Sequence, residues 1–377
     1  MKRWLLVGVG LCLSAALLWG AACGGGASGS GGDPSAQIAW GPTVGDLTGT
    51  SVRLAWYTNT PDLGEVEIGG QTVAGDGPVQ AHQVQLQSLQ PGRTYRYRLH
   101  ATTPTATFTG PWHEFTTPAA GLTDFDFCAY GDTRSDAAAH RQVVEALVKC
   151  RPRLVLHTGD LVDNGADLAG WKLFFPVIAH FSGSVPFYPC VGNHEDDAEL
   201  YDQLLPLPAG QGLRGHQWYS AVFGSCQIIS LDSDADQAAQ GEWLRQLLAQ
   251  PRPAGVAWRL AMFHAPPYTS GPHEPDAGAL QYWCPLLENG GVDLVFNGHN
   301  HYCERSLHGG LNYLTVGGGG APLYEASLPN PFQQSFHSVL SFARVRVSAQ
   351  SLQVTALDTQ LRTLDTVTVT HPPAATP

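Results

Sequence analysis

Side chains suited to binding metal ions follow five apolar stretches of the chain. They are Asp132, Asp160, Asn193, His264, and the closely spaced pair His299 and His301. Each apolar stretch reads as a buried strand, and ligands in α/β proteins bind where such strands end and loops gather. A glycine stands before most of these residues and lets the backbone turn sharply there. We therefore expect two carboxylates, one amide and three imidazoles to meet in one cleft.

This set of side chains fits phosphate-ester chemistry. Two metal ions about 3.5–4 Å apart can hold a phosphate and lower the pKa of a bound water. A carboxylate bridge with imidazoles suits two transition-metal ions, divalent or trivalent (Fe, Mn or Zn), better than Ca²⁺. His194 directly follows Asn193 and is the candidate general acid or phosphate donor. Each signal alone is weak, but their fixed order along the chain is a strong indication.

The ordered motifs GD, GDLVDNG, GNHE, FHAPPYTSGPH and GHNHYCER, across residues 122–325, resemble the calcineurin-like metallophosphoesterases and, within them, the purple acid phosphatases. The resemblance implies a four-layer α/β/β/α sandwich. It implies one metal held by Asp132, Asp160 and His301, and a second held by Asp160, Asn193, His264 and His299. Asp160 would bridge the two ions. His273 matches a histidine on the substrate side of the family's site.

The sequence departs from the family pattern at the first metal. Arg134 stands where many members have histidine, and Asp163 stands where purple acid phosphatases have a tyrosine ligand. Without that tyrosinate, an iron-loaded protein should not be purple. His140, Asp163 or solvent can complete the shell of the first metal. Arg134 can offer a planar fork to substrate phosphate, or form a surface salt bridge.

Strand patterns divide the chain into two folded parts. Residues 36–119 alternate apolar and polar side chains with period two, which predicts an all-β sandwich, and LQPGRTYRYRL with WHEFTTP resembles a fibronectin type III-like module. Turns are expected at Pro61-Asp62 and Pro91-Gly92. Residues 122–371 alternate apolar strands with helical stretches, which is typical of α/β folds, and end in further strands. The chemistry lies in this second part.

The N-terminus predicts export. Residues 1–22 have a charged start and an apolar run typical of a signal peptide, and Cys23 follows small residues as in a bacterial lipobox. Residues 23–35 form a Gly/Ser-rich flexible linker. The expected location is the bacterial cell envelope through a lipid anchor, or otherwise the periplasm or medium. A net charge of −12, with 43% hydrophobic and 14% charged residues, indicates a globular protein and excludes an electrostatic nucleic-acid binder.

Three further features carry smaller predictions. The six cysteines beyond the leader permit disulfides in an exported protein, although the sequence leaves their pairing open. They are Cys128, Cys150, Cys190, Cys226, Cys284 and Cys303. Gly317 to Gly320 lack the Lys-Ser/Thr of a nucleotide-binding loop and are expected to allow close backbone approach near the site. Asp232, Asp234 and Asp236 are expected to form a polar turn before a helix.

We therefore predict a metal-dependent phosphoric ester hydrolase that cleaves small phosphate monoesters with a metal-bound hydroxide. A phosphodiesterase of the same superfamily is the first alternative, because the same ions serve both reactions. A non-catalytic surface-anchored binding protein is the second. The expected partners are a phosphate-ester substrate and, through the lipid anchor alone, a membrane. The sequence carries no signal for an oligomeric state.

Overall fold

The computed structural model describes residues 37–371. The predicted signal peptide, Cys23 anchor and linker lie outside the described residues. Within residues 37–371, no helix combines the length and apolar composition needed to cross a membrane.

The N-terminal part is a seven-stranded β-structure in which one long strand serves two sheets. β2 pairs through its first half with β1 and β4, and through its second half with β3 and β5, which also pairs with β6 and β7. The strands are β1 (Ile38–Gly45), β2 (Val52–Ile68), β3 (Gln71–Ala74), β4 (Val79–Leu86), β5 (Thr94–Thr102), β6 (Thr107–Thr109) and β7 (His113–Thr116). The predicted β-sandwich is confirmed.

One predicted turn of this sandwich is wrong. β2 continues through Pro61-Asp62 and does not end before it. The pairing of β2 with β4 is irregular between Tyr57 and Asp62. Pro61, which has no backbone N–H to donate, therefore interrupts no regular strand hydrogen bond. The strand then passes from one sheet to the other. The turn at Pro91-Gly92, before β5, is confirmed.

The α/β part begins with a six-stranded sheet in the order β10-β9-β8-β19-β20-β21. The first three strands are parallel and the last three antiparallel, so the C-terminal strands complete this sheet as predicted. The strands are β8 (Phe125–Tyr130), β9 (Val155–His157), β10 (Phe187–Pro189), β19 (Ser341–Val347), β20 (Ser351–Asp358) and β21 (Thr363–Thr370). The helices between them are α1 (Ala137–Leu147), η1 (Val148–Cys150), α2 (Leu168–Ile178) and α3 (Glu199–Leu204).

An eight-stranded sheet follows, in the order β11-β12-β13-β14-β15-β17-β16-β18. Its strands are β11 (Gly210–Gln211), β12 (Trp218–Phe223), β13 (Cys226–Ser230), β14 (Trp258–Met262), β15 (Leu294–Asn297), β16 (Cys303–His308), β17 (Leu311–Val316) and β18 (Gln333–His337). The accompanying helices are η2 (Leu213–Gly215), α4 (Gln237–Ala249), η3 (Ala279–Trp283) and α5 (Cys284–Asn289). β13, β14, β15 and β17 run parallel at its centre.

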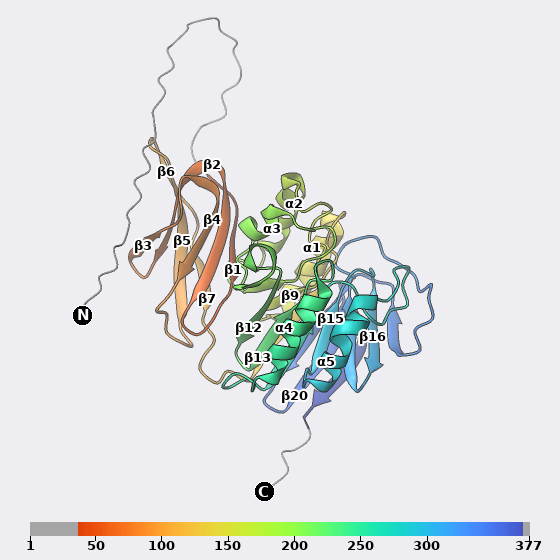
Figure 1. Ribbon diagram of the computed structural model, residues 1–377. Helices are drawn as coiled ribbons and strands as arrows, with labels where there is room; N and C mark the ends of the chain where they lie inside the picture. Colours follow the sequence, from red (N-terminus) through yellow and green to blue (C-terminus); the bar gives the residue numbers. More distant parts are fainter. Residues whose placement is uncertain (1–36, 372–377) are drawn as a thin grey trace, which may run out of the picture. The chain divides into compact units, whose positions relative to one another are not determined.

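The two sheets of the α/β part pack face to face, with helices on both outer faces (Figure 1). Alternate side chains of one strand enter different layers: Phe127 joins the core between the sheets, whereas Tyr130 joins the core under α1 and α2. In the second sheet, Met262 faces the first sheet and Phe263 faces α4 and α5. The predicted four-layer α/β/β/α sandwich is confirmed.

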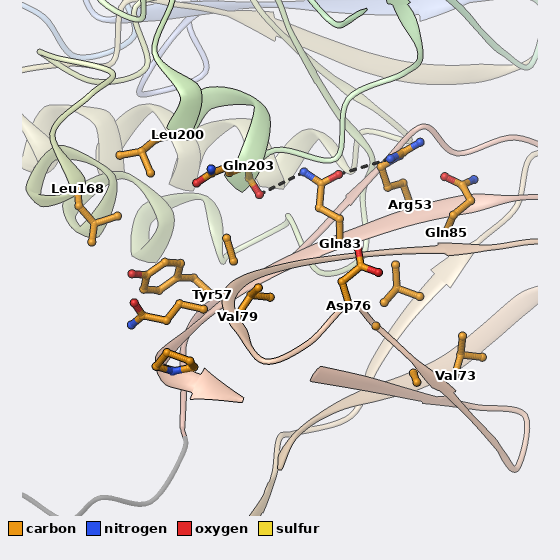
Figure 2. Close-up of a pocket in the computed structure, with 16 residues that line it drawn as sticks. Arg53, Tyr57, Val73, Asp76, Val79, Gln83, Gln85, Leu168, Leu200 and Gln203 are labelled. Atoms are coloured by element: carbon orange, nitrogen blue, oxygen red, sulfur yellow. Dashed lines mark hydrogen bonds between the residues drawn. The ribbon is translucent and has the colours of Figure 1, made fainter. Parts of the chain in front are cut away.

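The β-sandwich and the α/β part meet beside α3. The side-chain amide of Gln83 donates to the backbone carbonyls of Asp202, Gln203 and Leu205, at 2.7, 3.2 and 3.0 Å. Asp202 and Gln203 lie in the last turn of α3 and Leu205 is its C-terminal cap residue, and carbonyls at a helix end lack hydrogen-bond partners within the helix. Figure 2 shows Gln83 reaching Gln203 at one edge of a groove of about 900 Å³. The sandwich therefore caps a helix of the α/β part.

Candidate metal centre

The predicted ligands follow the ends of strands that run side by side. Asp132 follows β8, Asp160 follows β9 and Asn193 follows β10, and these three strands are parallel neighbours. His264 follows β14, and His299 follows β15, its parallel neighbour in the second sheet. Contacts between the two sets of loops, such as Asp160 with His264, show that both sets open at the same end. The predicted convergence is a consequence of this topology.

Asn193, His264 and His299 turn their side chains toward one another. The Oδ1 atom of Asn193 lies 3.1 Å from Nε2 of His264 and 3.0 Å from Nδ1 of His299. The two imidazole nitrogens are 3.2 Å apart. Nε2 of His264 also lies 3.2 Å from Oδ1 of Asp160. Four electron-pair donors thus face a common point, which is the arrangement that a transition-metal ion requires.

Asp132 and His301 form a second pair of potential ligands. Nε2 of His301 is 3.6 Å from Oδ1 of Asp132, and both side chains are almost completely buried. One potential ligand atom from each of Asp132, Asp160 and His264 lies within 4.8 Å of the others. Asp160 therefore lies close to Asp132, a predicted ligand of the first metal, and to His264, a predicted ligand of the second.

Hydrogen bonds to backbone carbonyls orient two of the imidazoles. Nδ1 of His264 lies 2.7 Å from the carbonyl oxygen of Thr158, and Nδ1 of His301 lies 2.7 Å from that of Pro322. A carbonyl only accepts, so each Nδ1 carries a proton, and each Nε2 points toward the carboxylates of the site. This orientation is typical of metal-binding histidines. The side chains present therefore fit the metal ions implied by the sequence.

Burial and mutual charge set the ionisation of the site. Burial lowers the pKa of His299 to about 3 and that of His301 to about 4, so both imidazoles are neutral and able to bind metal. Burial also opposes protonation of His264, but the Asp160 carboxylate outweighs it and raises the pKa of His264 to about 10. Burial raises the pKa of Asp132. Without a metal, His264 carries the proton that balances the Asp160 carboxylate.

The backbone is strained at the ligands. Asp132, Asp160 and His299 have φ values of 58°, 56° and 67°, in the left-handed region that side chains other than glycine rarely adopt. Of the preceding glycines, Gly159 itself has a positive φ of 90°. Gly131 serves a different purpose, because a Cβ there would lie 2.0 Å from the Thr158 hydroxyl. The glycines therefore permit close packing of adjacent strand ends as well as turns.

Glu195 fixes the loops that carry the ligands. Its completely buried carboxylate accepts the backbone N–H groups of Asp160, Leu161, Val162 and Gly192, at 2.8 to 3.2 Å. Burial raises the pKa of Glu195, and these N–H donors oppose that rise. The sequence interpretation quoted this residue within GNHE but gave it no role. Its position, two residues after Asn193, was the available signal.

Arg134 lies against the carboxylates of the site. Its Nε donates to Oδ2 of Asp160 at 3.2 Å, and its Nη2 donates to Nε2 of His301 at 3.4 Å. Nη1 is 3.6 Å from Asp163, whose exposed carboxylate also accepts the Ser135 hydroxyl. Arg134 is thus part of the site. Asp163, predicted as a possible ligand, contacts Arg134 and Ser135.

The predicted catalytic histidines lie at the open side of the site. His194 donates from Nδ1 to the carbonyl of Asp163 at 2.6 Å, and its Nε2 is 3.9 Å from Oδ2 of Asp160. The ring of His273 packs 4.2 Å from that of His299. Both imidazoles are partly exposed, so a substrate can reach them.

His140 is not among the side chains brought together here. It is buried, its Nε2 lies 3.3 Å from the Tyr130 hydroxyl, and its ring stacks on Phe174. These contacts place it beneath α1 and α2, in the core on the outer face of the first sheet. His140 was predicted to reach back to Asp132 from the start of α1. The packing of α1 instead directs its ring into this aromatic core.

Sequence reasoning missed the contacts that hold His273. Asn300, between the paired histidines, accepts the N–H of His273 and donates to its carbonyl and to Thr269. Tyr324 stacks on His301 with ring centroids 4.1 Å apart, and nothing in the sequence indicated this contact.

The glycine run also lies near the site. Gly317 comes close to Asp132, so the expected close approach of the glycine run is confirmed.

The acidic turn before α4 is also confirmed. Asp236 caps the helix by accepting the N–H of Ala239, and Asp232 accepts the N–H of Asp234. Neither contact belongs to the metal centre.

Comparison with known proteins agrees with this geometry. Residues 125–303 match the model of the calcineurin-like phosphoesterase family, so the chain carries a calcineurin-like phosphoesterase domain. It is similar to Purple acid phosphatase 18 of Arabidopsis thaliana, with 25% identity over 63% of this chain and 58% of that protein. It is also similar to Acid phosphatase type 7 of Mus musculus, with 26% identity over 68% of this chain and 67% of that protein.

A solved structure shares the fold. A purple acid phosphatase from yellow lupin (Lupinus luteus) seeds superposes with a TM-score of 0.74 at 19% identity, over 87% of this chain and 74% of that chain. The chain spans less than two thirds of several curated relatives, from 37% to 65% of their length. The chain therefore has the fold and phosphoesterase domain of the purple acid phosphatase homologues.

Proposed function

We propose that this protein hydrolyses small phosphate monoesters at a binuclear metal centre. The observation that carries the proposal is the convergence of six ligand-type side chains, one of which is the Asp160 carboxylate that both metal positions would share. Asp160 lies 3.2 Å from His264 on one side, and Arg134 binds its second oxygen on the other. Asp132 and His301 would complete the first metal position, and Asn193, His264 and His299 the second. Fe, Mn and Zn suit these ligands.

Bound ions would supply charge to hold a phosphate and to ease deprotonation of a water. The chain's own residues supply the rest. Arg134 offers planar N–H donors to the non-bridging phosphate oxygens, as its contact with the Asp160 carboxylate illustrates. His273, beside His299, would contact the substrate from the opposite loop.

His194 would protonate the departing alkoxide. Its Nδ1 donates to the Asp163 carbonyl, which fixes the ring and leaves Nε2 facing the site. A general acid in this position speeds such reactions by about 10²- to 10⁴-fold. The partial exposure of His194 supports this role, because the leaving group must reach it from solvent.

Three outcomes of one assay separate the candidate functions. The purified protein, loaded with Zn²⁺, Mn²⁺ or Fe, is incubated with p-nitrophenyl phosphate and with bis(p-nitrophenyl) phosphate. We expect turnover of the monoester. Turnover of the diester alone would replace the proposal with a phosphodiesterase. Turnover of neither by protein that holds two equivalents of metal would support the non-catalytic binding protein.

Matched variants test the assignment to Asp160. Asp160→Asn removes the shared negative charge, and we expect loss of bound metal and at least a 100-fold fall in monoester turnover. Asp236→Asn is the control, because asparagine caps α4 as well as aspartate does and the metal centre is untouched. Equal metal content in both variants would contradict the proposed bridge.

We also propose export and lipid anchoring through Cys23. The support is the charged start, the apolar run and the small residues before Cys23 in the sequence. Expression of the full chain in a bacterium, followed by radiolabelled palmitate incorporation and membrane fractionation, tests it. Label in the wild type and none in Cys23→Ser is expected. A soluble, unlabelled wild type would exclude the anchor.

A further inference from the structure

Two aromatic side chains line the open side of the candidate metal centre. Tyr324 stacks on His301, with ring centroids 4.1 Å apart and ring planes 17° apart. His273 packs on His299, with centroids 4.2 Å apart. The rings of Tyr324 and His273 lie 5.6 Å from each other. Tyr324 and His273, called here the aromatic wall, therefore form a continuous surface beside one predicted ligand of each metal position.

Backbone hydrogen bonds fix Tyr324 in this place. Its N–H donates to the carbonyl of His301 at 3.0 Å, and Nδ1 of His301 donates to the carbonyl of Pro322 at 2.7 Å. The N–H of Ala321 donates to the carbonyl of Asp132 at 2.8 Å. The segment that leads to Tyr324 is thus tied to two loops that carry predicted ligands, so the aromatic wall keeps its distance from the metal positions.

A buried carboxylate holds the two loops of the aromatic wall together. Glu304 is 1% exposed and accepts the N–H and the hydroxyl of Ser270, at 3.0 and 2.6 Å. It also accepts the side-chain amide of Asn330 at 2.8 Å. Ser270 belongs to the loop of His273, and Asn330 belongs to the loop of Tyr324. Because both loops share this anchor, the aromatic wall is organised before a substrate binds.

One face of the Tyr324 ring is available to a ligand. His301 covers the other face, and His273 meets the ring at a tilt of 59° rather than in a stack. Within residues 37–371, no further aromatic ring lies against Tyr324, and the residue is partly exposed. In the same part of the chain, the ring nitrogens of His273 make no hydrogen bond. A planar group bound beside the metal positions can therefore stack on Tyr324.

We propose that Tyr324 is a specificity-determining residue, and that the aromatic wall selects phosphate monoesters whose leaving group is a planar aromatic ring. This inference rests on the proposed function, because it places the substrate phosphate at the metal centre. An aryl phosphate carries its ring one oxygen away from the phosphorus, which brings the ring within reach of side chains that touch the predicted ligands. Stacked or edge-to-face aromatic contacts strengthen binding by about 2- to 10-fold beyond the burial of area.

Binding of phosphonates tests the aromatic wall without relying on turnover. Phenylphosphonate and cyclohexylphosphonate carry rings of similar size, but only the first ring is planar and aromatic. Their carbon–phosphorus bonds resist hydrolysis, so calorimetric titration of the full-length, Zn²⁺-loaded protein gives both dissociation constants. We expect phenylphosphonate to bind about 2- to 10-fold more tightly than cyclohexylphosphonate. Methylphosphonate, which has no ring, reports whether the phosphate position is intact.

Three variants assign the preference to Tyr324. Tyr324→Leu keeps an apolar side chain but removes the ring, so we expect the preference for phenylphosphonate to disappear. Tyr324→Phe keeps the ring and should keep the preference. Tyr282→Leu is the control, because Tyr282 is an exposed tyrosine in η3, outside the metal centre, and should also keep it. Methylphosphonate should bind all four proteins equally well.

Equal binding of the two ring phosphonates by the wild type would overturn the inference. A preference that survives in Tyr324→Leu would overturn it too, as would failure of every phosphonate to bind the metal-loaded wild type. The monoester assay described above decides the proposed function separately. A protein that hydrolyses p-nitrophenyl phosphate without preferring phenylphosphonate would lose only the role of the aromatic wall, whereas one that shows the preference without turnover would lose only the hydrolase activity.

Discussion

Glu195→Gln is the most direct test of how the metal centre is held in shape. The Glu195 carboxylate lies completely buried and accepts four backbone N–H groups from two loops, one carrying Asp160 and the other preceding Asn193. Glutamine has the same size, but its side chain ends in one acceptor oxygen and one NH₂ donor. The substitution therefore turns an acceptor toward the backbone into a donor without creating a cavity.

The cost follows from counting donors. Each carboxylate oxygen receives two N–H groups: Oε1 those of Leu161 and Val162, and Oε2 those of Asp160 and Gly192. Either orientation of the amide leaves two buried N–H groups facing an NH₂. An unsatisfied buried donor costs about 1–3 kcal/mol, so we expect a loss of about 2–6 kcal/mol in the free energy of unfolding. Misplaced loops should weaken metal binding by about 10- to 100-fold.

Urea unfolding of the metal-free variant measures the first quantity, and metal titration measures the second. Glu199→Gln is the matched control, because Glu199 is exposed and its side chain accepts a hydrogen bond from the Gln203 amide, which glutamine can also accept. We expect that control to unfold within about 0.5 kcal/mol of the wild type. If Glu195→Gln behaves like the control in both measurements, the proposed role of Glu195 in fixing the loops is refuted.

Three other predictions follow from particular side chains. The iron-loaded protein should lack a strong visible tyrosinate band in its absorption spectrum, because Asp163 stands where the family has tyrosine, and such a band would contradict the assignment. Burial lowers the pKa of His140 to about 3. The contribution of His140 to the free energy of unfolding is therefore complete above pH 6.5 and falls by about 1.4 kcal/mol per pH unit as the pH drops toward 3. His140→Phe should flatten this pH dependence in urea titrations and leave the metal content unchanged. Gln83→Ala removes three hydrogen bonds to the end of α3 and should lower the free energy of unfolding by about 1–3 kcal/mol, whereas exposed Gln87→Ala should not.

Local patterns in the sequence were sufficient to predict much of the fold. The strands ending at Asp132, Asp160 and His264 were expected from apolar runs, because strands buried on both faces are apolar at nearly every position. The tail strands were also predicted. The prediction of a turn at Pro61-Asp62 was wrong because local sequence signals do not show that a strand can pass from one sheet to another at a proline.

The contacts between loops were beyond local patterns. Glu195 and Asn300 act by binding backbone groups of loops distant in sequence, and neither residue type signals such a role. His140 was expected near Asp132 from its place in the chain, yet the direction of α1 turns its ring toward Phe174. Such directions depend on how a helix packs on the sheet, which the spacing of residues does not specify.

The sequence by itself determined which chemical groups are available and which strand ends carry them, because residue type and periodicity are local properties. Only the tertiary structure decided which groups meet, because parallel neighbours and face-to-face sheets bring together loops that lie far apart in the chain. The clustering of ligands around Asp160 and the buried contacts of Glu195 both arise at that level.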